Sequence, residues 1–296
     1  MKPEDIKISY GIELEAFLIE KKKYRRGCDT HIKNATHEMT EKLGTFYGNP
    51  QIQYGGIMDS KIITDGTVLE AHHLFPLSCL PVYNRSLIYL PLNALKTLTD
   101  EHRIFENYEL SFDAFYKAGY KENNQTVFDN PGNTFASEKV MYNAYDSTFR
   151  IKPKKEKIEN VSFRTAGLHI HLGFDKEISD KIFTDIKQNG YKYSQAHDAW
   201  LGENGTHTNY RANYIIQLID GIYESVVPFS AKEQQRESQY STKGDYRIRL
   251  ADITVDGRPT LEYRRLSSEF ALKPQKIQDE FFKQLHKRLQ FFLSTL

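Results

Sequence analysis

Three short segments of the chain each carry two polar side chains separated by a single residue: Glu13 and Glu15, His169 and His171, and Glu262 and Arg264. In a β-strand, such side chains point to the same face and lie about 7 Å apart. If the three segments are strands of one sheet, one of its faces carries carboxylates, imidazoles and a guanidinium. A face of this kind predicts a site that holds cations and anions together.

The acids and one imidazole of this face are of the type that binds divalent ions. Magnesium takes hard oxygen ligands, and manganese also accepts an imidazole. The expected strand that ends near Glu70 adds a further acid to the polar side. Four carboxylates on one surface repel one another without cations between them, so we expect two or three bound Mg²⁺ or Mn²⁺ ions. The ligand set is Glu13, Glu15, Glu70, His169 and Glu262.

Arginines near these acids indicate what the ions hold. Arg236 and Arg247 flank the polar segment Tyr240 to Asp245, which we expect to be a flexible loop. Arginines beside carboxylate-bound metals favour a phosphoryl ligand, because both neutralise the charge that develops in phosphoryl transfer. The chain has neither a Gly-x-x-x-x-Gly-Lys-Ser/Thr loop nor a Gly-x-Gly-x-x-Gly turn after a strand. We therefore expect metals and arginines on the sheet to hold the phosphates of ATP.

The order of these motifs resembles the glutamine synthetase-like carboxylate-amine ligases, and within them the phage-type amidoligases of the COOH-NH2 ligase type 2 group. The resemblance runs from about residue 8 to about residue 270. Five motifs carry it: Gly11-x-Glu13-x-Glu15, Asp65-Gly66 with Glu70, Gly167-x-His169-x-His171, Arg236 with Tyr240 and Arg247, and Glu262-x-Arg264.

The resemblance implies a fold and a set of roles. The fold is α+β, a glutamine synthetase-like catalytic domain with a mostly antiparallel curved sheet and helices packed on its outer face. The metal ligands are the five residues given above. The residues that touch ATP phosphates or the acyl phosphate are His171, Arg236, Arg247 and Arg264, with Tyr240 also at the ATP site. Related enzymes usually pair a second acid with the one at Glu70, and here only Asp65 is near, so the number of ions stays open.

The implied reaction is ATP-dependent formation of an amide bond. ATP phosphorylates a substrate carboxylate, and an amine then attacks the acyl phosphate; the substrates are small molecules or peptides. Two alternatives stay open: a guanidino-kinase-like phosphotransferase, and a binding protein that has lost catalysis. Taken singly, each residue pair is also typical of a solvated strand. We interpret His72 and His73 as ordinary strand-end residues, and Arg265 as a structural residue on the opposite face.

Composition sets the remaining expectations. The 296 residues are 39% hydrophobic and 27% charged, which is typical of a folded protein, and we expect one domain over 1–296 with loop insertions. A formal net charge of +1 gives no argument for nucleic-acid or membrane binding. Cys28 and Cys79 lack zinc-site spacing, and we find no signal peptide or membrane span. We expect a cytoplasmic protein, in the host cytoplasm if phage-encoded; the oligomeric state is open.

Apolar periodicity predicts the main elements. Alternation predicts strands over 6–19 and 107–120, and the run 57–73 predicts a turn at Asp65-Gly66 that leads into a strand through Glu70. Three-to-four-residue spacing predicts helices over 37–44, 83–105, 177–188, 209–229 and 273–296. Pro91 is expected to mark a kink or boundary.

Overall fold

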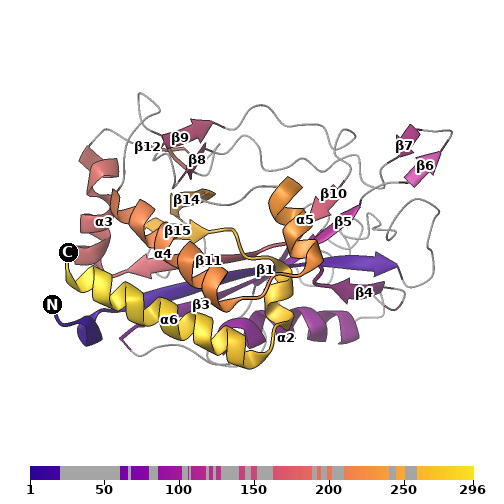
Figure 1. Ribbon diagram of the computed structural model, residues 1–296, viewed down its shortest axis with the longest axis horizontal. Coiled ribbons are helices and arrows are strands. Elements are labelled where there is room, and N and C mark those ends of the chain that lie inside the picture. The colour runs from indigo at the N-terminus through magenta and orange to yellow at the C-terminus, as the bar shows by residue number, and fades with distance from the viewer. Residues whose placement is uncertain are drawn as a thin grey trace.

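The fold combines an antiparallel sheet with packed helices (Figure 1). The computed structural model describes residues 1–20, 61–65, 68–79, 86–101, 106, 108–117, 120–122, 125–127, 140–143, 148–151, 163–188, 192–194, 199–201, 210–239, 245–250 and 259–296. The expected helix over 37–44, Tyr240, Gly66 and Cys28 lie outside these ranges. No helix within them has the length and apolarity required to span a bilayer.

The main sheet has nine strands, and every strand pair in it is antiparallel. Its order is β2 (Lys61–Asp65), β3 (Val68–Ser78), β1 (Ile8–Glu20), β11 (Leu168–Phe174), β15 (Pro259–Tyr263), β14 (Asp245–Leu250), β8 (Val140–Asn143) and β9 (Thr148–Ile151), with β4 (Tyr108–Ser111) paired to β1. The longest strand, β1, therefore lies inside the sheet although it comes first in the chain, and both of its neighbours carry polar side chains.

Three short pairs lie outside the main sheet: β5 (Phe115–Lys117) with β10 (Phe163–Thr165), β6 (Tyr120–Glu122) with β7 (Gln125–Val127), and β12 (Lys192–Ser194) with β13 (Ala199–Leu201). The expected strand over 107–120 is thus divided into β4 and β5, which pair with different partners, and begins a third strand, β6. The break falls between Ser111 and Phe115, where the chain leaves the main sheet.

One face of the main sheet forms the core. The alternate residues Tyr10, Ile12 and Leu14 of β1 are fully buried, and so are the alternate residues Ile170 and Leu172 of β11. Because successive side chains of a strand point to opposite faces, Gly11, Glu13 and Glu15, like His169 and His171, lie on the other face. The two faces differ as the alternation in the sequence predicts.

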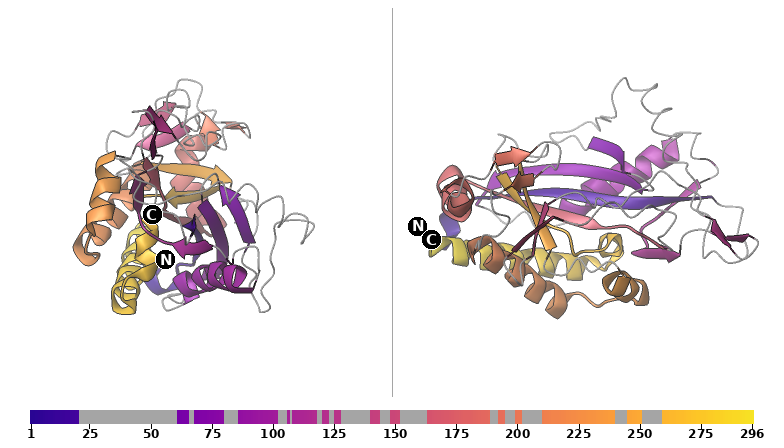
Figure 2. Two further views of the ribbon diagram at one scale, coloured as in Figure 1. Left: turned by 90° about the vertical axis from the view of Figure 1, so that its right-hand side faces the viewer. Right: turned by 90° about the horizontal axis from the view of Figure 1, so that it is seen from above.

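Helices cover the apolar face. These are α2 (Ser86–Glu101), α4 (Tyr210–Val226) and α6 (Gln275–Ser294), whose apolar stripes join the sheet in one core. Figure 2 shows α4 and α6 on the same side of the sheet. The remaining helical elements are η1 (Pro3–Asp5), α3 (Lys176–Gln188), α5 (Ala231–Gln239) and η4 (Ser268–Leu272). Pro91 lies inside α2, one turn from its start, and does not end it.

The helix stripes follow the spacing that the sequence predicts. In α6, Phe281, Leu285 and Leu289 recur every four residues and are fully buried. Phe281 packs edge-on against Phe270 of η4, with ring centroids 5.2 Å apart. Burying an aromatic or leucine side chain of this kind contributes roughly 1.5–3 kcal/mol. This layer of helices covers the apolar face of the sheet, and the polar residues occupy the opposite face.

Candidate metal centre

Strand register brings the predicted polar pairs side by side. In the β1 and β11 pair, Glu13 lies opposite His169 and Gly11 lies opposite His171. In the β11 and β15 pair, His171 lies opposite Glu262. Residues directly opposite each other on one face of an antiparallel pair have Cβ atoms about 4.5–5.5 Å apart. Three segments distant in the sequence therefore meet on the polar face.

Glu13, His171 and Glu262 form the first candidate ligand group. One ligand atom of each lies within 4.8 Å of the other two, and all three residues are buried. Nε2 of His171 lies 2.9 Å from Oε1 of Glu13 and 3.9 Å from Oε1 of Glu262. The two carboxylates carry a charge of −2 when ionised, which matches a divalent cation with a neutral imidazole as third ligand.

One tautomer of His171 fits a cation at this position. Its Nδ1 lies 3.3 Å from the hydroxyl oxygen of Thr260. When Nδ1 donates its proton to that hydroxyl, Nε2 presents a lone pair to the Glu13 carboxylate. The short Nε2 to Oε1 approach does not have hydrogen-bond geometry. Two lone pairs that face each other in a buried site repel, and a divalent ion between them removes the repulsion. The residues present thus fit a metal.

His169 borders the same group. Its Nδ1 bonds to Oε2 of Glu13 at 2.8 Å and lies 3.5 Å from Oε1 of Glu262. Burial, with help from the charge of Arg264, lowers the pKa of His169, and the two glutamates only partly oppose this. His169 is therefore neutral near pH 7 and can donate a proton to the Glu13 carboxylate or offer a lone pair.

A second candidate ligand group shares Glu13. It consists of Glu13, Glu70 and His72, with one ligand atom of each within 4.8 Å of the other two. Strand β3 supplies the last two residues: Glu15 lies opposite Glu70, and Glu13 lies opposite His72. The interpretation of His72 and His73 as strand-end residues is wrong, because β3 continues to Ser78. The signal was present in the sequence, since Glu70 and His72 repeat the two-residue spacing of the other pairs.

Two arginines border the centre in different ways. Nε of Arg264 lies 3.6 Å from Oε1 of Glu262 and makes no hydrogen bond to any described residue. Arg236 is buried on α5 and donates from Nη1 to the carbonyl of Arg265 at 2.8 Å. A Cβ on Gly167 would lie 3.2 Å from Nη2 of Arg236 and 2.9 Å from Nε2 of His169. Gly167 thus allows Arg236 and His169 to approach the same point.

The remaining predicted site residues either lie outside the two ligand groups or are described only in part. Glu15 belongs to neither ligand group, and its carboxylate accepts a hydrogen bond from the backbone N–H of Gly167. Arg247 lies opposite Glu262 in the β14 and β15 pair, which gives it a register position on the polar face. Asp65 ends β2. The side chains of Arg247 and Asp65, and all of Tyr240, lie outside the description.

Arg265 takes part in a separate network on the helix side of the sheet, as the alternation of the strand predicts. It pairs with Asp220 of α4 at 3.0 Å and with Glu237 of α5 at 3.0 Å. Asp220 also accepts a hydrogen bond from Tyr263 at 2.7 Å. Burial, followed by the charge of Asp220, raises the pKa of Tyr263. This network joins α4 and α5 to the strand that carries Glu262.

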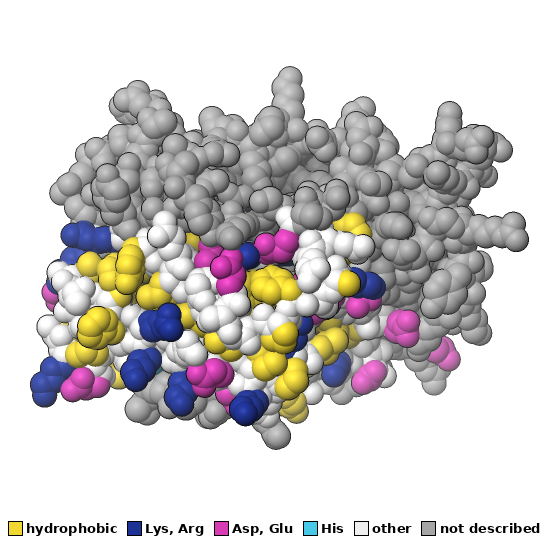
Figure 3. All heavy atoms as spheres, viewed as in Figure 1, with side chains coloured by type: hydrophobic (Ala, Val, Ile, Leu, Met, Phe, Trp, Pro, Cys, Tyr) yellow, Lys and Arg dark blue, Asp and Glu magenta, His cyan; other side chains and the backbone are white. Residues whose placement is uncertain are grey.

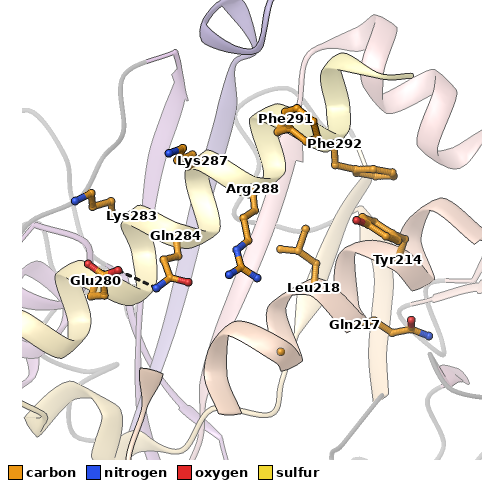
Figure 4. A pocket seen from close by; sticks show the side chains of 11 residues that line it. Tyr214, Gln217, Leu218, Glu280, Lys283, Gln284, Lys287, Arg288, Phe291 and Phe292 are labelled. Carbon is orange, nitrogen blue, oxygen red and sulfur yellow. Dashed lines mark hydrogen bonds between the residues drawn. The ribbon is translucent and has the colours of Figure 1, made fainter. Parts of the chain in front are cut away.

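A groove lies elsewhere on the molecule, between α4 and α6 (Figure 4). It measures about 790 Å³, and its lining includes Tyr214, Leu218, Lys287, Arg288 and Phe291. Basic, acidic and hydrophobic side chains are interspersed over this face of the molecule (Figure 3). None of the lining residues belongs to either ligand group, so this groove is distinct from the metal centre.

Comparison with known proteins gives similarity to solved structures and none to known sequences. No protein-family model matches the chain, and no curated protein sequence matches it. Among solved structures, the chain is similar to the crystal structure of a novel glutamine synthase homolog, with a TM-score of 0.41 and 9% sequence identity. The alignment covers 96% of this chain and 55% of that one, so this chain spans about half the length of that protein. Similarity at this level assigns no activity to the chain.

Proposed function

We propose that this chain is an ATP-dependent carboxylate-amine ligase that uses divalent ions held on the polar face of its sheet. One observation supports the proposal above others: Glu13, His171 and Glu262 converge from three strands on a buried point beside Arg264. The order of motifs that resembles the amidoligases provides the reaction class.

The charges of the centre favour an anionic ligand once cations are bound. Glu262 is fully buried, and Arg264 is 8% exposed. Two ions and Arg264 together exceed the negative charge of the ligand groups, so the loaded centre attracts an anion such as a triphosphate. When bound, the ions would supply charge neutralisation for the phosphates of ATP. The chain's own part is to orient that ligand with Arg264, and with Arg236 and Arg247 nearby.

The proposed reaction has two steps, phosphorylation of the carboxylate and attack by the amine. A substrate carboxylate oxygen attacks the terminal phosphorus of ATP, the bond from that phosphorus to the bridging oxygen breaks, and ADP leaves. The product is an acyl phosphate. An amine nitrogen then attacks the acyl carbon, phosphate leaves with the electrons of the carbon–oxygen bond, and the nitrogen loses a proton. Net, ATP, a carboxylate and an amine give ADP, phosphate and an amide. The buried position of the centre limits hydrolysis of the acyl phosphate by water.

The test is ATP turnover with defined substrate pools. The protein is incubated with ATP, Mg²⁺ or Mn²⁺, and pools of carboxylic acids and amines, and ADP, phosphate and new masses are measured. We expect ADP release that needs both an acid and an amine, with an amide as product. The Glu262→Gln variant should lose this turnover. Glu280→Gln, which changes an exposed carboxylate on α6, should retain it.

Other outcomes would contradict the ligase proposal. ADP release with a phosphorylated amine and no amide identifies a guanidino-kinase-like phosphotransferase. An absence of ADP release with every pool, from a protein that binds ions and melts cooperatively, identifies a binding protein. Equal turnover by Glu262→Gln and wild type would remove Glu262, and the metal centre with it, from the mechanism.

A further inference from the structure

The groove between α4 and α6 is long and open (Figure 4). Its lining on α6 begins at Glu280 and ends at Phe292, and its lining on α4 runs from Tyr214 to Gly221. At 1.5 Å per residue, the α6 wall is about 18 Å long, or a little more than three helical turns. Tyr214 is 51% exposed and Phe291 is 67% exposed, so these rings do not enclose a small molecule on most sides, as small-ligand pockets do. The groove therefore fits an elongated occupant that lies along it.

Apolar side chains from both helices line the groove. Leu218 of α4 and Phe292 of α6 are partly buried against the core and also line the groove. The rings of Phe292 and Tyr214 have centroids 4.4 Å apart, which joins the two helices at one end of the groove. Covering these side chains and the exposed ring of Phe291 removes apolar surface from water, which contributes roughly 25 cal/mol per Å². The lining therefore favours an occupant with apolar side chains on one face.

Gly221 leaves space in the α4 wall of the groove that no described residue fills. A Cβ added at Gly221 would meet no atom within 4 Å. Gly221 lies inside α4, where a glycine destabilises the helix by roughly 0.5–1 kcal/mol relative to alanine. The packing of the described chain therefore does not require this glycine. A backbone that approaches α4 closely from outside does require it, so Gly221 indicates where a partner's helix lies.

The charges of the groove are mostly positive. Lys283, Lys287 and Arg288 line it and are exposed, and none of them forms an ion pair with a residue that the structure describes. Figure 4 shows the guanidinium of Arg288 between the two helices. The only acid of the lining, Glu280, accepts a hydrogen bond from Gln284 at 2.8 Å. Three cations and one carboxylate give the lining a net charge of +2, which is complementary to an acidic partner.

We propose that the groove between α4 and α6 binds an acidic amphipathic helix of another protein. The apolar residues of that helix, spaced three or four apart, contact Leu218, Phe291 and Phe292, and its Glu or Asp residues pair with Lys287 and Arg288. A second copy of this chain fits less well, because a two-fold contact of groove against groove brings the cations of both copies together. The inference does not rest on the proposed function, since no lining residue belongs to either ligand group.

Fluorescence anisotropy with defined peptides tests the proposal. The probe is a labelled helical peptide of about 18 residues, with leucines every three or four residues and glutamates beside them, and a matched peptide has lysine in place of each glutamate. We expect the full chain to bind the acidic peptide at least about tenfold more tightly than the basic one. Lys287→Glu reverses a charge and Gly221→Leu fills the open space, so each should weaken binding at least about tenfold. Lys276→Glu, at an exposed lysine of α6 outside the lining, is the matched control and should bind like wild type.

The other outcomes overturn the inference. No binding of the acidic peptide at about 1 mM, or equal affinity for the two peptides, removes the acidic helix as the occupant. Wild-type affinity in both Lys287→Glu and Gly221→Leu removes the groove as its site. A dimer in sedimentation velocity that Lys287→Glu dissociates identifies a second copy instead, and tighter binding of a single-stranded oligonucleotide than of the peptide identifies nucleic acid. If Gly221→Leu does not melt cooperatively, Gly221→Ala replaces it, and both variants should bind Mn²⁺ as wild type does.

Discussion

Removing the charge of Glu13 should abolish stabilisation of the protein by divalent ions. Glu13 is 3% exposed and belongs to both ligand groups. The Glu13→Gln substitution keeps the volume of the side chain and its ability to accept a hydrogen bond from His169. It removes one negative charge from each group. The variant therefore separates the loss of a ligand charge from the loss of packing.

The expected size follows from linkage. An ion at about 100 times its Kd stabilises the folded state by about 2.7 kcal/mol. With an unfolding entropy of about 2.1 cal/mol/K per residue, 296 residues give roughly 0.6 kcal/mol/K, so each ion raises Tm by about 4 °C. A unit charge about 4 Å from a divalent ion contributes about 8 kcal/mol at an effective dielectric constant of about 20. We therefore expect Glu13→Gln to bind each ion at least about a hundredfold more weakly. At the same ion concentration, this reduces the rise in Tm to under about 1 °C per ion.

Thermal unfolding with and without Mn²⁺ measures this effect. Chelator-treated wild type should gain about 4 °C for one ion, or about 8 °C for two, at a saturating Mn²⁺ concentration held fixed for all variants. Glu280→Gln should respond like wild type, because the Glu280 carboxylate is exposed on α6 and lies outside both groups. A shift of wild-type size in Glu13→Gln would refute the reasoning, and so would a wild-type protein whose Tm ignores Mn²⁺.

Three further predictions concern the supporting structure. Gly167→Ala places a Cβ 2.9 Å from Nε2 of His169 and should weaken Mn²⁺ binding at least about tenfold by calorimetry; unchanged affinity would show that the ring can move freely. Arg265→Ala leaves Asp220 buried without its cation and should cost about 3–5 kcal/mol of unfolding free energy, a Tm loss of about 5–8 °C in calorimetric scans; a loss under 1 °C would contradict this. Burial lowers the pKa of His286, so the unfolded chain takes up that proton at a higher pH than the folded protein does. The unfolding free energy from urea titrations should therefore fall as pH drops below about 6.5. The fall should be less steep in His286→Gln, and an equal pH dependence in both proteins would contradict this role of His286.

The sequence predicts the structure best where apolar and polar residues alternate strictly along a strand. Strands β1, β11 and β15 each alternate apolar and polar residues, so the face of Glu13, His169 and Glu262 could be assigned before their pairing was known. The register between strands could not be predicted, because it depends on pairing between distant segments. That register places His171, opposite both Gly11 and Glu262, in the first ligand group.

Two features of the structure differ from what the sequence predicted locally. His72 and His73 were interpreted as strand-end residues, but β3 continues past them, and His73 is buried against Phe75 on the core side. The helix α5 that carries Arg236 was not predicted, although Arg236 was expected beside the loop that follows it. The start of α5 has a capping signal that was overlooked, since Ser230 and Glu233 exchange hydrogen bonds across the first turn.

The place of β1 inside the sheet has a consequence for synthesis of the protein. Glu13 is made early and Glu262 late, and a ribosome that adds about 5–20 residues per second needs roughly 12–50 s between them. Until β15 emerges, β11 is an open sheet edge in the growing chain, and the first ligand group still lacks Glu262. A nascent chain therefore depends on protection of that edge, and a fragment that stops before β15 should leave β11 unpaired on that side and lack a complete first ligand group.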